Sequence, residues 1–75
     1  MITTELQLSP REKQLLRRLA AGKTDAEIAL RLGGTREQIS AQRARLLGRL
    51  GIGTAAEIAD AAKRLAYLER YKGVS

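Results

Sequence analysis

The sequence predicts an all-α fold, a compact four-helix bundle that contains a helix-turn-helix. The main support is a pattern that occurs four times: Ser or Thr followed three residues later by Glu or Gln, the capping box of a helix start. Each pair precedes apolar residues at the 3.6-residue spacing of an amphipathic helix, and no segment shows the alternation typical of a strand. The apolar residues are mostly Leu, Ile and Ala, a helix-favouring set. Helices are expected near residues 10–21, 25–32, 36–50 and 55–70.

The first helix is expected to begin after Ser9. Ser9 and Glu12 form a capping-box pair, and Pro10 fits the first helical position, where no backbone donor is needed. Gly22 ends the helix as a residue that accepts the left-handed conformation. The residues expected to face the core are Leu15, Leu16 and Leu19.

The second helix is expected to begin with the same capping pattern. Thr24 caps it, Glu27 completes the box, and Asp25 favours the positive end of the helix dipole. Gly33-Gly34 breaks the helix and allows a tight turn into Thr35. Two helices joined by so short a Gly-containing turn predict a helix-turn-helix. The inward residues are Ile28, Ala29 and Leu32.

The third helix is the predicted recognition helix. Thr35 and Gln38 form its capping box, and Gly51 ends it. Its inner stripe is Ile39, Leu46 and Leu50. Its opposite face is small and nearly flat: Glu37, Ser40, Ala41, Ala44 and Gly48. Arginines surround that face: Arg36, Arg43, Arg45 and Arg49. A slim helix edged with guanidinium groups suits the major groove of DNA.

The last helix begins after Thr54, which pairs with Glu57 in a fourth capping box. Its inner stripe is expected to be Ile58, Ala62 and Leu65. A second face carries small residues beside a cation: Ala55, Ala59, Lys63 and Ala66. Small side chains permit close helix approach, so we hypothesise a homodimer through this face. The alternative is an ordinary solvated helix surface.

The domain organisation follows from these elements. Residues 1–8 are interpreted as an N-terminal lead-in or the remnant of a linker, residues 9–71 as one helix-turn-helix domain, and residues 72–75 as a frayed tail. A chain of 75 residues holds one small domain with a modest core.

Composition narrows the function classes. The net charge of +6 indicates a polyanionic partner, although Arg enrichment is also typical of a solvated surface encoded by a GC-rich genome. The chain has no Cys and no His, which removes disulfides, thiol nucleophiles, the usual general base and most metal sites. We therefore expect no enzyme activity, no metal and no cofactor. No apolar run approaches membrane-spanning length and no signal-peptide pattern begins the chain, so a cytoplasmic protein without membrane contact is expected.

Several blocks resemble the LuxR-type, GerE-like helix-turn-helix domain. They are L-S-P-R-E at Leu8 to Glu12, L-x-x-G at Leu19 to Gly22, E-I-A-x-R-L at Glu27 to Leu32, Ile39, R-L-L-x-R-L-G-I at Arg45 to Ile52, and A-E-I at Ala56 to Ile58. The resemblance implies a bacterial transcription regulator that binds double-stranded DNA. In this family the domain usually ends a response regulator or a ligand-sensing protein, and some members are free-standing.

The resemblance also implies site residues. Ser40, Ala41 and Ala44 would face the groove, and the phosphate contacts would come from Gln42, Arg43 and Arg45. Lys23 and Thr24 would add phosphate contacts at the start of the second helix. The remaining candidates from the residue pattern are Thr35, Arg36 and Arg49. Members often carry longer polar side chains where Ser40 and Ala44 stand, so strong base readout is not expected.

Two alternatives remain open. Ser9 to Glu12 and the segment 35–50 also resemble region 4 of a bacterial sigma factor, which contains a related helix-turn-helix. The weak base-reading face is also consistent with a protein-interaction module of the same fold. Such a module would heterodimerise with another regulator and inhibit it, or bind RNA polymerase.

Overall fold

The computed structural model describes residues 7–67. It contains the helices α1 (Pro10–Ala20), α2 (Asp25–Leu32), α3 (Arg36–Leu50) and α4 (Ala55–Ala62), followed directly by a π-helical turn, η2 (Lys63–Tyr67). No strand occurs within residues 7–67. The all-α prediction is confirmed, and the first three helices lie within one residue of their expected bounds. The predicted lead-in up to residue 6, the last helix beyond residue 67 and the tail 72–75 lie outside the described residues.

All four predicted capping boxes are present. Ser9, Thr24, Thr35 and Thr54 each accept a hydrogen bond from the backbone N–H three residues later, at 3.1 Å in every case. The Glu or Gln at that later position accepts in return from the N–H of the capping residue, at 2.8–3.0 Å. A side-chain cap typically stabilises a helix by about 1 kcal/mol. Each helix start is therefore fixed by local sequence alone.

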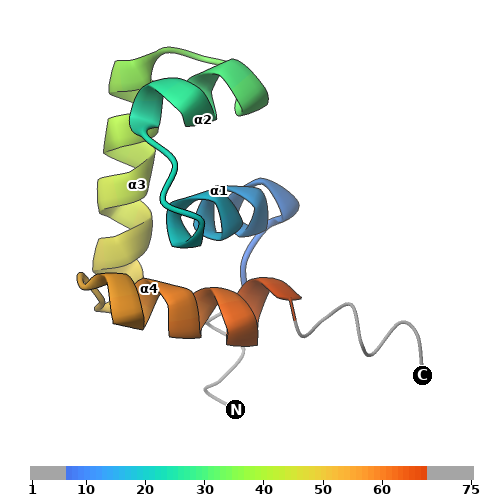
Figure 1. Ribbon diagram of the computed structural model, residues 1–75, viewed down its shortest axis with the longest axis vertical. Helices are drawn as coiled ribbons and strands as arrows, with labels where there is room; N and C mark the ends of the chain where they lie inside the picture. The colour runs from blue at the N-terminus through green and yellow to red at the C-terminus, as the bar shows by residue number, and fades with distance from the viewer. Residues whose placement is uncertain (1–6, 68–75) are drawn as a thin grey trace.

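The other three helices stack along one side of α3. Figure 1 shows α3 along one edge of the molecule, with α2, α1 and α4 stacked beside it. α2 packs mainly on α3, while α1 packs on α4 and η2. One side of α3 therefore faces the bundle and the other side faces away from it.

One core connects all four helices and η2. Leu16, Ile28 and Ile39 are fully buried, one each from α1, α2 and α3. The remaining buried residues are Leu8, Leu15, Leu46, Ala61, Ala62 and Ala66. Partly buried apolar residues surround them: Leu19, Ala20, Ala29, Leu32, Leu50, Ile52, Ile58 and Leu65. Every residue predicted as core is therefore buried or packed against the core.

The turn between α2 and α3 depends on its two glycines. Gly33 and Gly34 have φ of +94° and +95°, a region that L side chains rarely adopt. A Cβ on Gly34 would also stand 2.7 Å from the Gln38 Oε1 that completes the α3 capping box. Arg11 of α1 donates from Nη1 to the Leu32 carbonyl at 3.0 Å and from Nη2 to the Gly33 carbonyl at 3.4 Å. These bonds hold the end of α2 against the start of α1.

The C-terminal part of the described chain differs from the prediction. The α-helical pattern places Ala66 within about 20° of Ala55 around the helix axis. Ala66 is instead only 1% exposed. The π-helical turn, with its i→i+5 bonds, adds a residue to the turn and rotates Ala66 toward the core. Arg17 fixes this turn, donating to the Ala66 carbonyl at 2.9 Å and lying 5.7 Å from the ring centroid of Tyr67.

Candidate nucleic-acid interface

The outer face of α3 is open to solvent. Glu37, Ala41, Ala44 and Gly48 are exposed, whereas Ile39 and Leu46 on the inner side are buried. Ser40 is half-buried at the border between the two faces. The sequence prediction of a small, nearly flat outward strip agrees with this burial pattern. A strip of this kind lets the helix backbone approach another surface closely.

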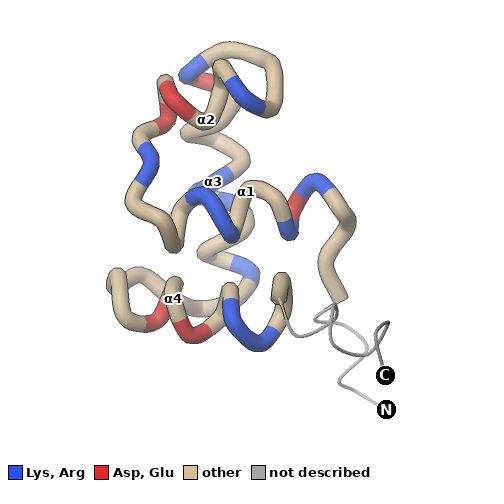
Figure 2. Tube along the Cα trace, turned by 45° about the vertical axis from the view of Figure 1, so that its right-hand side comes forward, with Lys and Arg blue, Asp and Glu red and all other residues tan. Residues whose placement is uncertain are grey.

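The four arginines of α3 are not equivalent. Arg36 and Arg45 are exposed and form no ion pair with any described residue. Arg43 and Arg49 are each bound to a carboxylate of another helix. Figure 2 shows positive positions on α1, α2, α3 and η2, and acidic positions on α1, α2 and α4.

Arg43 connects the recognition helix to the start of α2. Its Nη1 lies 2.9 Å from Oδ1 of Asp25, and its Nη2 lies 3.5 Å from Oγ of Ser40. The Asp25 side chain is only 16% exposed, and that of Arg43 is 39% exposed. The pair fixes the position of α3 relative to α2, and it reduces the positive charge that Arg43 presents to solvent.

Arg49 connects the end of α3 to the start of α1. Its Nη1 lies 2.6 Å from Oε2 of Glu12, whose Oε1 accepts from the backbone N–H of Ser9. The Ser9 hydrogen bond and the Arg49 guanidinium together hold the pKa of Glu12 below its ordinary value. Arg49 therefore has a structural partner and is less available to an external anion than Arg45.

Two of the predicted phosphate contacts lie at helix starts. Thr24 and Thr35 are exposed, but their hydroxyl groups already accept the capping bonds of α2 and α3. Glu27, which accepts from the Thr24 N–H, has its pKa lowered chiefly by that bond. Lys23 is exposed beside this helix start. The threonines act as caps first, and Lys23 is the freer of these groups.

A shallow pocket extends the outer face of α3 toward α1. It has a volume of about 240 Å³ and is lined by Ser9, Arg11, Glu12, Leu15, Gln42, Arg45 and Leu46. Gln42 is half-buried in it, while Arg45 is exposed at its side. Two of the residues predicted as phosphate contacts, Gln42 and Arg45, thus lie beside the start of α1, where Arg11 adds a third polar group.

The sequence that forms these helices matches a known family. Residues 6–62 match GerE, described as bacterial regulatory proteins, luxR family. The chain belongs to the LuxR family. The resemblance seen in the sequence is thereby confirmed, and this membership indicates a DNA-binding regulator of transcription. No curated protein matched the chain. No solved structure matched it either.

The residues predicted to form a dimer interface in this LuxR-family chain differ in solvent exposure. Ala55, Ala59 and Lys63 are exposed along α4 and the start of η2. Ala66 is buried by the π-helical turn, so its predicted place on the same surface is wrong. Asp60 and Arg64, on neighbouring turns, form an exposed ion pair at 3.2 Å.

Neither a metal-binding cluster nor a membrane-spanning helix is present within residues 7–67. Residues 7–67 contain no group of three or more His, Cys, Asp or Glu side chains placed to hold a metal ion. Within the same range, every helix is too short or too polar to cross a lipid bilayer.

Sequence reasoning missed the two ion pairs and the Arg11 contacts. Arg43 lies four residues after Ile39 and three before Leu46, next to a buried stripe. A charged group in such a position needs an opposite charge, and this signal could have predicted a partner for Arg43. The spacing along one helix could not identify Asp25 as that partner, because the pairing depends on how α2 crosses α3.

Proposed function

We propose that this LuxR-family chain is the DNA-binding module of a bacterial transcription regulator, and that α3 enters the major groove with its outer face. The observation that carries the proposal is the open strip of Ala41, Ala44 and Gly48, beside which Arg36 and Arg45 form no ion pair with a described residue. The backbone of α3 can approach base edges closely there, while the two guanidinium groups reach phosphates on either side.

Affinity in this arrangement comes mainly from phosphate contacts. Arg36 and Arg45 contribute fully because no described carboxylate neutralises them, whereas Arg43 and Arg49 contribute less. Lys23, Thr24, Thr35 and Gln42 contribute smaller polar contacts at the edges of the interface. Each phosphate neutralised by a cation releases counterions, so binding weakens steeply as salt is added.

Sequence selectivity in this arrangement is modest. A bidentate base contact contributes roughly 1–3 kcal/mol of discrimination. Ala41 and Ala44 cannot form one, and the Ser40 hydroxyl lies 3.5 Å from an Arg43 nitrogen. Selectivity therefore depends on DNA shape and on the few apolar contacts of short side chains.

The test is duplex titration by fluorescence anisotropy at several salt concentrations. Arg45→Ala is expected to weaken binding and to reduce the slope of log affinity against log salt by about 0.9, the value for one phosphate contact. Arg31→Ala removes an equal charge from α2, on a surface outside the proposed interface, and is the matched control. Equal effects of the two substitutions would show that only net charge matters and would contradict the proposed interface.

We further propose a cytoplasmic regulator that dimerises through the exposed face formed by Ala55, Ala59 and Lys63. Small side chains on this face allow close approach of a second copy. Analytical ultracentrifugation with and without duplex DNA tests the dimer. Ala59→Glu, at an exposed position, should convert a dimer to a monomer, and a strict monomer in both conditions would contradict the dimer while leaving DNA binding intact.

The second candidate function is a protein-interaction module that binds another regulator or RNA polymerase. It is favoured by the absence of long base-reading side chains at Ser40, Ala41 and Ala44. If duplex binding is absent at low salt while a purified regulator of the same family forms a complex with the chain, this function replaces the first.

A further inference from the structure

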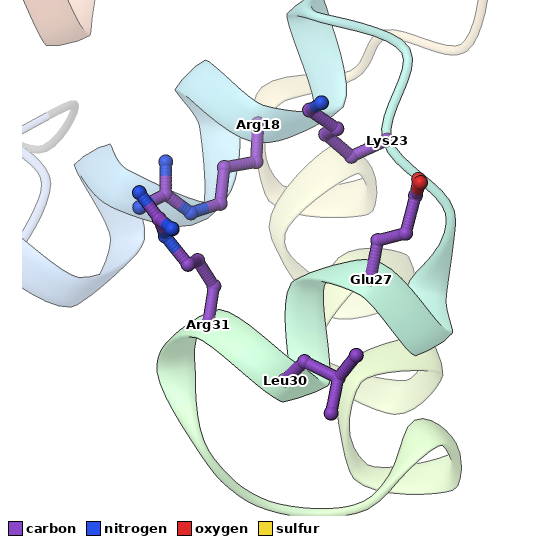
Figure 3. Close-up of a pocket in the computed structure, with 5 residues that line it drawn as sticks. All are labelled: Arg18, Lys23, Glu27, Leu30 and Arg31. Carbon is purple, nitrogen blue, oxygen red and sulfur yellow. The ribbon is translucent and has the colours of Figure 1, made fainter.

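A second basic surface lies between α1 and α2. It is a pocket of about 360 Å³, which we call the back pocket, lined by Arg18, Lys23, Glu27, Leu30 and Arg31. Figure 3 shows the guanidinium ends of Arg18 and Arg31 next to each other, with Lys23 and Glu27 on the other side of the opening. The DNA-binding proposal uses Lys23 alone of these five residues.

The cations of the back pocket are poorly satisfied within the described chain. The Nε of Arg18 is buried and has no hydrogen-bond partner there. Arg18 and Arg31 form no ion pair with any described carboxylate. Glu27, the acidic residue of the lining, already accepts from Thr24 at the start of α2. Lys23 has the Glu27 carboxylate nearby and helps to lower its pKa, whereas the two adjacent guanidinium groups lack a matching anion among the described residues. A buried unpaired donor such as the Arg18 Nε destabilises a structure.

An apolar side chain adjoins this positive charge. Leu30 is 88% exposed, the highest exposure among the large apolar residues of the described chain. Leu30 lies two residues from the fully buried Ile28, about 200° around the helix, so it faces away from the core. A ligand that carried only phosphate groups would leave this side chain in water. A ligand with both a carboxylate and an apolar group would match the whole surface.

The two arginines of the back pocket lie on the side away from the proposed DNA interface, and Lys23 lies at the border between the two surfaces. In Figure 3 the lining side chains lie in front of α2, and α3 passes behind it. The inner residues of α3, Ile39 and Leu46, are turned toward the bundle, so its outer strip points away from the pocket. We therefore expect a duplex held by the outer strip to leave Arg18 and Arg31 free, with Lys23 as the one residue of the pocket lining that the two proposals share.

We propose that the back pocket binds an acidic segment of a partner protein, with one carboxylate between Arg18 and Arg31 and a neighbouring apolar side chain against Leu30. Charge complementarity selects an acidic partner, and the exposed Leu30 selects protein over nucleic acid. This inference goes beyond the proposed DNA binding and does not depend on it.

The experiment is an NMR titration of the isotope-labelled chain with a synthetic ten-residue peptide that alternates glutamate and leucine. Binding should shift the Arg18 Nε–Hε resonance and the amides of Leu30 and Arg31. Arg31→Gln should weaken binding about tenfold, as expected for loss of one charge-assisted bond. Arg31 is exposed, so this substitution should leave the fold intact. Arg45→Gln, which removes the same charge from α3, should leave peptide affinity unchanged.

Two further probes separate the sources of binding. A peptide with Ser in place of every leucine has equal charge and should bind several-fold more weakly if Leu30 takes part. Duplex DNA should leave the Arg18 and Leu30 resonances unshifted. The proposal is overturned if the acidic peptide shifts only α3, if both peptides bind equally, or if Arg31→Gln weakens duplex binding as much as Arg45→Gln does. The last result would assign the pocket to phosphate.

Discussion

The two arginine-rich surfaces of this chain differ in how the fold treats their charges. On the α3 side, Arg43 and Arg49 are bound to Asp25 and Glu12, carboxylates of α2 and α1. On the back pocket side, neither Arg18 nor Arg31 has a described carboxylate partner. The first surface has short apolar residues between its arginines, and the second has the exposed Leu30.

This difference separates two kinds of basic surface. Ion pairs between helices orient α3 precisely, and they leave Arg36 and Arg45 as the charges available to a phosphate backbone. The back pocket instead concentrates charge around a depression. A high net positive charge alone would not distinguish the two surfaces, because each has arginines without a described ion pair. The side chains beside those arginines differ: short residues on α3 and the exposed Leu30 at the back pocket.

The largest expected effect is a charge introduced into the outer strip of α3. Ala44→Glu should weaken duplex binding by about 100-fold or more, because a like charge facing phosphates costs several kcal/mol. Leu30→Glu is the matched substitution in the back pocket and should change duplex affinity only slightly. Fluorescence anisotropy measures both, and circular dichroism verifies that the helices remain. A similar loss of duplex affinity in the two variants would contradict the proposal that only the α3 surface binds DNA.

An intermediate effect is expected from Asp25→Asn, which removes the partner of Arg43. The free energy of unfolding should fall by up to about 1 kcal/mol, the range for a partly exposed ion pair. Duplex affinity should rise several-fold, because a carboxylate is removed near the interface and Arg43 is released. Urea denaturation and anisotropy give the two values. Asp60→Asn, which breaks the exposed pair with Arg64 on α4, is the control and should change neither value appreciably.

The smallest expected effect is the pH dependence of stability. Backbone hydrogen bonds at the helix starts lower the pKa values of Glu12, Glu27 and Glu57, and Arg49 lowers that of Glu12 further. A carboxyl group whose pKa is lower in the folded state stabilises the fold above its unfolded-state pKa, roughly 4.3 for Glu. That stabilisation is lost as the pH falls through the folded-state pKa, so the melting temperature should decrease below about pH 4.3.

Two glutamine variants connect this pH dependence to the two surfaces. Glu12→Gln removes both a capping carboxylate and the ion-pair partner of Arg49. Glu27→Gln, in the back pocket, removes only a capping carboxylate. Glu12→Gln should therefore reduce the acid-induced decrease in melting temperature more than Glu27→Gln does. Thermal melts between pH 3 and pH 7 measure this difference. An equal reduction would show that the Arg49 pair does not stabilise the fold.

The sequence contained most of the fold because its helix signals are local. Each capping box depends on residues three apart, and Gly33, Gly34 and Gly51 mark ends through their own backbone preference. The π-helical turn at Lys63–Tyr67 contains no Pro or Gly from which it could have been predicted. Arg17 of α1 contacts this turn through the Ala66 carbonyl, 49 residues further along the chain. A local sequence pattern cannot predict a contact over that separation.

The candidate site could be predicted from the sequence less completely than the fold. The outward strip of α3 follows from helical periodicity, so Ala41 and Ala44 could be predicted as exposed. Whether an arginine has an ion-pair partner depends on which residues of another helix lie near it. Asp25 is the partner of Arg43 and Glu12 that of Arg49, whereas Arg18 shares a pocket with another cation, Arg31. Such pairings arise from packing across the bundle, and helical periodicity holds no information about them.

The most direct test of the central claim is an amide NMR titration of the chain with a duplex selected from a random pool. The account predicts that the largest shifts occur along the outer strip of α3 and at Arg36 and Arg45, and that they diminish as salt is added. It also predicts little change at Leu30 and Arg31. Shifts centred on the back pocket, or no salt-sensitive shifts with any duplex, would contradict the assignment of α3 as the DNA-binding element.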